Sequence, residues 1–439
     1  MQAINVSSGF KTSGVVLPHQ QIFHVHQTER KRIHLPVALF LISLVVPWVI
    51  YFGPLRMSVY RFFLLAMFLP CMAMWLGGKA GRVRTSDLAL LLYSFWAALS
   101  LAIIHGFEAT SQSSGIIFIE TLGPYLVARC YIRDADDFYN AFSLLFRIVV
   151  LLLPFGVVEL LSGVNISREL FAAILPTFTD AMPPRMGLTR VQSVFDHPIL
   201  FGVITGSILA PVHLVLGCNR DLFQRLLMTG VVAGTSMLSV SSGPLTALIA
   251  QAFLLCWNGL FGAIRSRWKI LIAILAVSSL VIELTANRSL LDIVVGYFLF
   301  DPGSYWYRKL IWTYGTESAL NHPLFGTGLN PWERPQWMTP SIDNFWLFHA
   351  VRYGLPAGIL MPLAFFSVYL AVCFKKGLDA REDECRTAFL ITMTGFFLVA
   401  WTVHFWDAAY VMLTFFMGSG VWMLDVTPNK TYGWEEHGA

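Results

Sequence analysis

The chain has 439 residues, of which 56% are hydrophobic and only 13% are charged, and its formal net charge is +4. Soluble domains carry about 25% charged residues, so this composition, with a mean hydropathy of +0.63, excludes a soluble globular protein. No run of basic residues is long enough to indicate a nucleic-acid partner.

Apolar windows of about 20 residues are the signal for transmembrane helices. The first predicted windows cover residues 35–53, 58–77, 86–104, 115–128, 138–161 and 198–216. The later ones cover residues 222–240, 245–260, 270–284, 346–374, 387–403 and 408–424. The sequence therefore predicts an all-α, polytopic membrane protein with about twelve transmembrane helices.

The distribution of Lys and Arg predicts the orientation of these helices. With the N-terminus in the cytoplasm, inner segments such as residues 30–32 and 79–84 carry more basic residues than outer segments. This agrees with the positive-inside rule. We therefore expect cytoplasmic tails at residues 1–34 and 426–439, with one membrane domain covering residues 35–425.

The first long outer segment, residues 162–197, ends in two arginines and a His-Pro pair that opens a predicted helix. The three side chains are Arg185, Arg190 and His197. The N-terminus of a helix binds anions, and the guanidinium fork matches phosphate oxygens. The pattern predicts a phosphate or pyrophosphate site at the outer membrane face. The alternative is that the arginines pair with nearby aspartates, Asp180 or Asp196, or with lipid headgroups.

The second long outer segment, residues 286–344, lies between the ninth and tenth spans and is expected to contain short helices. It supplies Arg308 and His322 and ends in Asp343 and Asn344. Asp343 is a candidate general base or acceptor for a sugar hydroxyl, with Asn344 as a hydrogen-bond donor. The alternative is that Asp343 caps the following helix. His322 precedes a proline, which is more typical of a turn residue than of a catalyst.

Within the fourth predicted span, Glu120 is followed by Gly123 and Pro124. An ionisable side chain that faces lipid is costly. We therefore expect Glu120 to line a cavity in a broken helix.

These pieces, in this order, resemble the superfamily of O-antigen ligases and O-antigen polymerases. The matching runs are residues 190–202, which begin Arg-Val-Gln-Ser-Val-Phe-Asp-His-Pro, and residues 308–328, which end His-Pro-Leu-Phe-Gly-Thr-Gly. The third run, residues 343–358, begins Asp-Asn-Phe-Trp-Leu. The resemblance covers roughly residues 138–370 in motifs and the remainder in hydropathy.

The resemblance implies a GT-C-like, metal-independent membrane glycosyltransferase without a cofactor, in the bacterial inner membrane. Its donor would be a glycan linked to undecaprenyl pyrophosphate, used at the periplasmic face with inversion at the anomeric carbon. By the same resemblance, Arg185 and Arg190 would bind the donor pyrophosphate, and His197, from the pattern described above, is assigned to the same site. Arg308 would stabilise the departing charge.

Ligases of this family usually have histidine at the position of Asp343, before Asn344. A carboxylate can also take the proton of a sugar hydroxyl, so the reaction survives this difference. The difference favours a polymerase of O-antigen or exopolysaccharide repeat units over the alternative, an O-antigen ligase that transfers the glycan to lipid A core.

The partners implied are the lipid-linked donor, an acceptor glycan or lipid A core, membrane lipid, a chain-length regulator and a flippase. A secondary transporter or a lipid-linked-sugar flippase is the alternative from a different class. Transporters often contain internal repeats and binding sites near the membrane midplane. The sequence shows no repeat, and its polar residues gather outside the spans.

Overall fold

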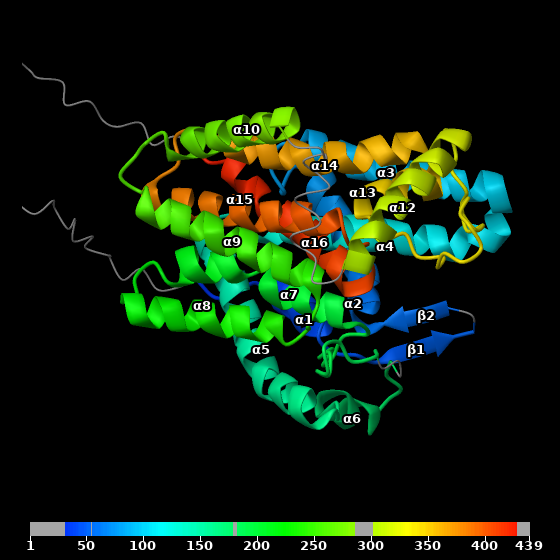
Figure 1. Ribbon diagram of the computed structural model, residues 1–439, viewed down its shortest axis with the longest axis horizontal. Helices are drawn as coiled ribbons and strands as arrows, with labels where there is room; N and C mark the ends of the chain where they lie inside the picture. The colour runs from blue at the N-terminus through cyan, green and yellow to red at the C-terminus, as the bar shows by residue number, and fades with distance from the viewer. Residues whose placement is uncertain (1–30, 54, 179–181, 286–301, 428–439) are drawn as a thin grey trace, which may run out of the picture. The chain divides into compact units, whose positions relative to one another are not determined.

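The computed structural model describes residues 31–53, 55–178, 182–285 and 302–427, which are predominantly helical (Figure 1). The first half comprises α1 (Leu35–Ser43), β1 (Val49–Phe52), β2 (Leu55–Ser58), α2 (Val59–Leu76), α3 (Thr85–His105), α4 (Phe107–Tyr131), α5 (Ala135–Ser162), α6 (Ile166–Ala172), α7 (Pro198–Gly206) and the π-helical turn η1 (Pro211–Leu216). The second half comprises α8 (Leu222–Met237), α9 (Ser242–Leu260), α10 (Arg267–Thr285), α12 (Pro302–Asn321), α13 (Phe345–Tyr353), α14 (Leu355–Cys373), α15 (Ala380–Ala400), α16 (Asp407–Ser419) and the 3-10 turn η2 (Val421–Leu424).

The predicted helical membrane character is confirmed, whereas the count of twelve spans stays a prediction. Among the described residues, eight helical segments are long and apolar enough to cross a membrane. They are α2, α3, α5, α7 with η1, α9, α10, α14, and α16 with η2. The other predicted windows coincide with α1, α4, α8 and α15. Of these, α1 has 9 residues and α8 has 16, while α4 and α15 begin with polar turns.

The first predicted window, residues 35–53, does not form one helix. It is helical only as far as Ser43, and its remainder leads into the antiparallel hairpin of β1 and β2, in which Val49 pairs with Ser58. Pro47 accounts for the change, because proline lacks an amide N–H and disfavours helical geometry in the residue before it. The valine and isoleucine side chains around it favour a strand.

The tenth predicted window is likewise divided, because α13 and α14 meet at Gly354, whose φ is +84°. The segment of residues 323–328 packs against this junction, where the Thr327 N–H donates to the Val351 carbonyl at 2.8 Å. A Cβ at Gly354 would overlap the carbonyl group of Leu324. Both the left-handed backbone and the close approach require glycine.

We expect Gly354→Ala to lower the free energy of unfolding by at least about 1–3 kcal/mol, the usual cost of a strained backbone conformation. Gly115→Ala is the matched control, since Gly115 lies within α4 and a Cβ added to it would meet no neighbouring atom within 4 Å. Alanine has a higher helix propensity than glycine, so the control substitution should be neutral or slightly stabilising. Thermal unfolding of the purified variants measures both, and equal midpoints would contradict this role of Gly354.

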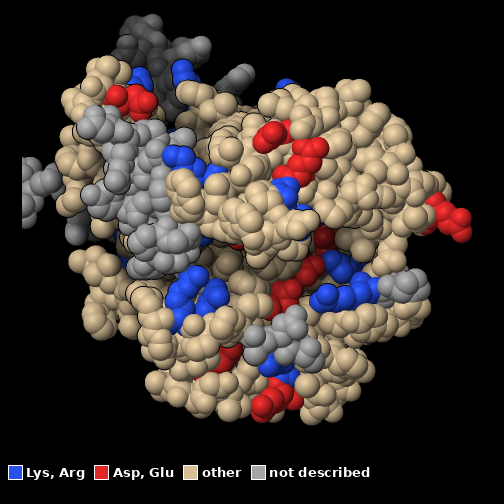
Figure 2. Space-filling model, turned by 45° about the vertical axis from the view of Figure 1, so that its right-hand side comes forward, with Lys and Arg blue, Asp and Glu red and all other residues tan. Residues whose placement is uncertain are grey.

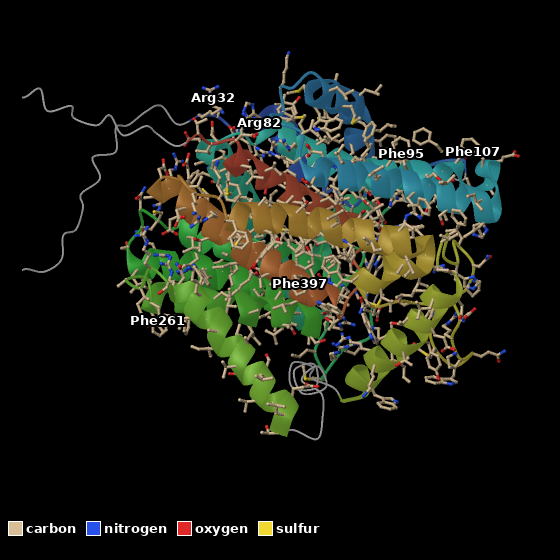
Figure 3. The ribbon with its side chains drawn as sticks, turned by 90° about the horizontal axis from the view of Figure 1, so that it is seen from above. Arg32, Arg82, Phe95, Phe107, Phe261 and Phe397 are labelled. Carbon is tan, nitrogen blue, oxygen red and sulfur yellow. The ribbon has the colours of Figure 1, made fainter. Side chains whose placement is uncertain are left out.

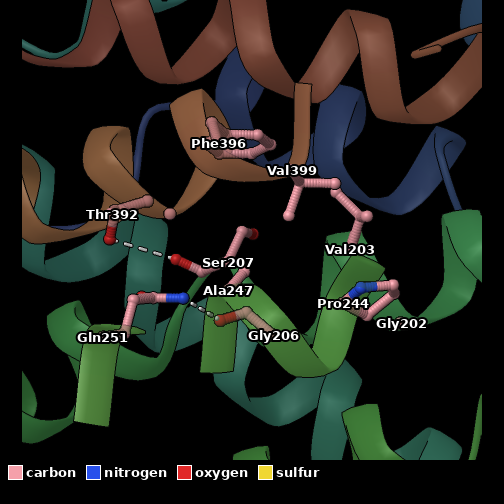
Figure 4. A pocket seen from close by; sticks show the side chains of 11 residues that line it. Gly202, Val203, Gly206, Ser207, Pro244, Ala247, Gln251, Thr392, Phe396 and Val399 are labelled. Atoms are coloured by element: carbon pink, nitrogen blue, oxygen red, sulfur yellow. Dashed lines mark hydrogen bonds between the residues drawn. The ribbon is translucent and has the colours of Figure 1, made fainter. Parts of the chain in front are cut away.

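The central helices are α4 and α16. α4 packs against α2, α3 and α16, and α16 also contacts α7. Close packing of α7, α9 and α15 depends on small residues and on two hydrogen bonds (Figure 4). Gln251 Nε2 donates to the Gly206 carbonyl at 3.2 Å, and Thr392 Oγ1 donates to the Ser207 carbonyl at 3.1 Å. The second bond has a clear cause, because Pro211, four residues after Ser207, has no N–H to donate.

The beginning of α3 and the end of η2 lie at the same end of the molecule. Asp425 accepts from Arg84 Nη2 at 2.6 Å and lies 3.3 Å from Arg133 Nη2. Arg82, which the charge distribution assigns to the cytoplasm, lies toward this end of α3, and Phe107 lies toward the other (Figure 3). The start of α16 therefore lies at the end opposite to Asp425.

Candidate functional site

Arg185 lies close enough to influence both Arg190 and Arg308, and these three arginines come from the two long segments that were predicted to be outer. Burial lowers the pKa of Arg308 to about 10; Asp343 opposes this shift, and Arg185 adds to it. Burial also lowers the pKa of Arg190 to about 10, and Arg185 adds to that shift. Both groups therefore remain charged at neutral pH. The structure brings together the predicted residues Arg185, Arg190, Arg308 and Asp343, which we call the arginine cluster.

Two guanidinium groups of the arginine cluster have unused hydrogen-bonding capacity. Arg308 Nη1 and Arg190 Nε are buried, and neither has a hydrogen-bond partner within the described parts of the chain. Arg190 is held by its Nη2 group, which donates to Ser241 Oγ at 3.0 Å. Burying a charged donor without a partner costs about 1–3 kcal/mol or more. The arrangement is therefore suited to an anionic ligand with several acceptor oxygens.

The sequence left open that Arg185 and Arg190 pair with Asp180 or Asp196. Asp196 does not pair with them, because it lies beside Asp407 and Trp406. The other candidate partner, Asp180, lies outside the described residues. Among the residues that are described, neither Arg185 nor Arg190 forms an ion pair.

The helix cap at the mouth of α13 is Asn344, and the alternative role of Asp343 as the cap is wrong. Asn344 Oδ1 accepts from the Leu347 N–H at 3.0 Å. Capping uses the side-chain oxygen, whereas the predicted donor role of Asn344 would use its nitrogen. Asp343 is half-buried and accepts from Ser341 Oγ at 2.5 Å. Its carboxylate therefore remains available to Arg308.

His197 caps α7 and borders the arginine cluster. Its Nδ1 accepts from the Ile199 N–H at 3.1 Å, so the proton of the neutral ring lies on Nε2. Burial lowers the pKa of His197 to about 4, and Arg190 adds to the shift. The ring packs edge-on against Trp406, with a centroid distance of 5.4 Å. His197 can therefore contribute a neutral N–H donor, not a positive charge, to an anion site.

His322 does not lie in the arginine cluster. It follows the end of α12, about 20 Å along that helix from Arg308, and its Nε2 lies 3.1 Å from Glu333 Oε1. Both side chains are nearly half exposed. This position agrees with the interpretation of His322 as a turn residue.

Glu120 is held by Arg61 and lies in a continuous helix, so the prediction of a broken helix is wrong. Arg61 Nε donates to Glu120 Oε1 at 2.7 Å, and Arg61 Nη2 donates to Asp407 Oδ1 at 2.7 Å. Pro124 removes the helical donor to the Glu120 carbonyl. Thr414 Oγ1 lies 3.4 Å from that carbonyl oxygen but nearer, at 3.1 Å, to the carbonyl of Val411 in its own helix. The helix α4 nevertheless continues past the proline. We call Arg61, Glu120 and Asp407 the charged triad.

Asp407 and Asp196 are candidate functional residues that the motifs alone did not single out. Burial raises the pKa of Asp196 to about 7, and the neighbouring Asp407 adds to the shift. Asp407 begins α16 with a φ of +44°, an uncommon conformation for a residue with a side chain. The available sequence signal was the position of Asp407 at the mouth of the last predicted span, where an ionisable group is a functional candidate.

A cavity of about 260 Å³ lies between α3, α4, α13 and the start of α16. Glu120 and Asp407 reach it from one side, and Trp406 separates it from His197. Figure 2 shows a hollow on this side of the molecule with acidic side chains inside it and basic side chains on both sides. The arginine cluster and the cavity are therefore neighbouring parts of one candidate site.

Among the residues that the structure describes, no group of three or more His, Cys, Asp or Glu side chains could hold a metal ion. Comparison of the sequence with models of known protein families and with characterised proteins found no match.

Proposed function

We propose that this protein is a membrane glycosyltransferase that polymerises oligosaccharide repeat units linked to a polyprenyl pyrophosphate at the outer face of the membrane. The observation that carries the proposal is the arginine cluster, in which Arg190 and Arg308 come from different outer segments and each has a buried N–H donor without a protein partner among the described residues. A pyrophosphate has the charge and the oxygens to satisfy these donors.

The reaction would be a displacement at the anomeric carbon of the donor glycan. An acceptor hydroxyl forms the new C–O bond while the bond to the pyrophosphate breaks, and the electron pair leaves with the pyrophosphate. Arg190 and Arg308 would stabilise the negative charge that develops on this leaving group. The protein must also position the acceptor hydroxyl opposite to it.

Two carboxyl groups could receive the proton of the acceptor hydroxyl. Asp343, the candidate from the sequence motif, lies near enough to Arg308 for its carboxylate to favour the charged guanidinium group. Asp196 lies beside Asp407, which lines the cavity, and its pKa of about 7 suits a general base at neutral pH. We therefore assign the orientation of Arg308 to Asp343 and proton transfer to Asp196.

This assignment predicts a dependence of the transfer rate on pH. The raised pKa means that Asp196 carries a proton below about pH 7, and a general base must be unprotonated. The rate should therefore rise as the pH increases through about 7, and Asp196→Asn should be slow at every pH. Initial rates of glycan transfer between pH 5.5 and 8.5 measure this. A similar profile for Asp196→Asn and the unmodified protein would contradict the assignment.

The test of the proposed function is conversion of a purified lipid-linked repeat unit by the purified protein in nanodiscs, with and without a lipid A–core acceptor. Elongation of the repeat unit without lipid A core supports a polymerase. Transfer to lipid A core alone indicates a ligase. Failure of both reactions with the native substrates would overturn the proposal.

A further inference from the structure

The cavity beside the arginine cluster has the lining expected of a sugar site. A single water needs only about 10–15 Å³ of such space, so the cavity volume of about 260 Å³ accommodates a small organic ring. Aromatic side chains line it, among them Tyr93, Tyr353 and Trp406. Aromatic faces pack against the C–H faces of sugars, and polar groups placed between them fix the orientation of a ligand.

Two histidines each add one ring nitrogen that has no hydrogen-bond partner among the described residues. His349 is 2% exposed, and its Nδ1 lies 2.7 Å from the Tyr93 hydroxyl. The opposite ring nitrogen, His349 Nε2, is buried without a partner among the described residues, as is His404 Nδ1. Both side chains line the cavity. Buried polar atoms without partners are uncommon in native structures, so these two point to a ligand with hydroxyl groups.

The charges around the cavity select against an anionic ligand. The described residues that line it include Glu120 and Asp407 but no Lys or Arg. Both carboxylates already bind Arg61, which lies outside the lining. Burial lowers the pKa of His404 to about 3, and Arg352 adds to the shift. The imidazole of His404 is therefore neutral and suits a neutral hydroxyl.

We infer that this cavity binds a neutral sugar ring of the acceptor glycan, with hydroxyl groups hydrogen-bonded to His349 and His404. The inference rests on the proposed function, because the acceptor must approach the anomeric carbon from the side opposite to the pyrophosphate. Trp406 and His197 separate the cavity from the arginine cluster. A sugar in the cavity would therefore occupy the acceptor side and leave the cluster free for the donor.

The test uses the full-length protein in nanodiscs and a lipid-free tetrasaccharide of neutral hexoses, with a matched tetrasaccharide that carries a uronic acid at its acceptor end. Saturation-transfer NMR measures binding of each without any transfer reaction. We expect the neutral tetrasaccharide to bind and the uronate to bind at least about tenfold more weakly, as expected when a buried carboxylate meets no cation.

Two variants locate the binding. Ser113→Trp fills the cavity from α4, and Ser111→Trp places the same side chain at an exposed position of that helix, away from the cavity. The first should abolish binding and raise the acceptor KM with the donor KM unchanged, whereas the second should do neither. His404→Phe keeps the stacking on Phe348 but removes the ring nitrogen. It should weaken binding about tenfold, the effect of losing one hydrogen bond to a buried group.

Two results would overturn the inference without affecting the proposed transferase activity. One is that the uronate binds as tightly as the neutral tetrasaccharide. The other is that a folded Ser113→Trp protein keeps the same binding and the same acceptor KM. Conversely, cavity-dependent binding of the neutral tetrasaccharide without transfer from a lipid-linked donor would overturn the proposed function and leave a carbohydrate-binding cavity. Thermal unfolding of each variant establishes that it is folded.

Discussion

Replacing either Arg190 or Arg308 with alanine is expected to reduce kcat/KM for the lipid-linked donor about 100-fold or more. This is the usual effect of removing one donor that stabilises charge in a transition state. Each guanidinium group has a buried N–H without a partner in the described part of the chain, so its removal takes away ligand contacts and not a structural hydrogen bond at that atom. Initial rates of repeat-unit elongation by purified protein measure the effect.

The controls for this prediction separate charge from geometry. Lys309→Ala removes the next cation on α12, which is exposed, and should leave the rate unchanged. Arg308→Lys keeps the charge but loses the planar fork that binds two phosphate oxygens, so its rate should lie between those of the unmodified and alanine proteins. Wild-type rates for both Arg190→Ala and Arg308→Ala would remove the basis of the proposed function.

Arg61→Ala is expected to destabilise the protein by about 3–5 kcal/mol, the typical cost of removing one partner from a buried ion pair. Arg61 is 12% exposed in its side chain and is the shared partner of Glu120 and Asp407. Without it, two neighbouring carboxylates would remain in an apolar environment without a cation. The free energy of unfolding in a denaturing detergent measures the change.

A combined variant tests whether the effect comes from uncompensated charge. Arg61→Ala together with Glu120→Gln and Asp407→Asn should be more stable than Arg61→Ala alone, because no buried carboxylate of the charged triad then remains. Glu120→Gln alone should have a smaller effect, because Arg61 keeps its 2.7 Å contact with Asp407. Additive losses of stability in the combined variant would show that charge compensation is not the role of the triad.

Hydropathy was sufficient to predict the helical membrane character of this protein. Long apolar windows with few charges predict membrane helices because hydrocarbon excludes unpaired polar groups. Arginines in outer segments contradict the positive-inside bias, which made Arg185, Arg190 and Arg308 functional candidates. In the structure, Arg185 lies near both Arg190 and Arg308. Arg190 and Arg308 are more than a hundred residues apart in the sequence, so their assignment to one site required the two segments to be treated together.

Prolines, glycines and potential capping residues marked possible helix ends in the sequence, but these residues alone did not determine where the helices end. Pro47 marks the end of the first helical window, and Gly354 marks the division of the tenth. Pro124 is equally prominent, yet α4 continues through it. The N-cap of α13 is Asn344 and not the adjacent Asp343, because the helix begins at Phe345 and the N-cap is the residue directly before the first helical one.

By itself, the sequence determined that the chain is a helical membrane protein, and it predicted that the arginines of two long segments outside the apolar windows are functional. The tertiary structure decided the charged triad, the pairing of Asp196 with Asp407 and the cavity with its two histidines. The physical reason is that hydropathy reflects the free energy of transferring a segment from water into a membrane, which does not depend on the helices that pack around it. Contacts such as Arg61 with Asp407, 346 residues apart, depend on the rotation and depth of helices that only their packing around α4 and α16 sets.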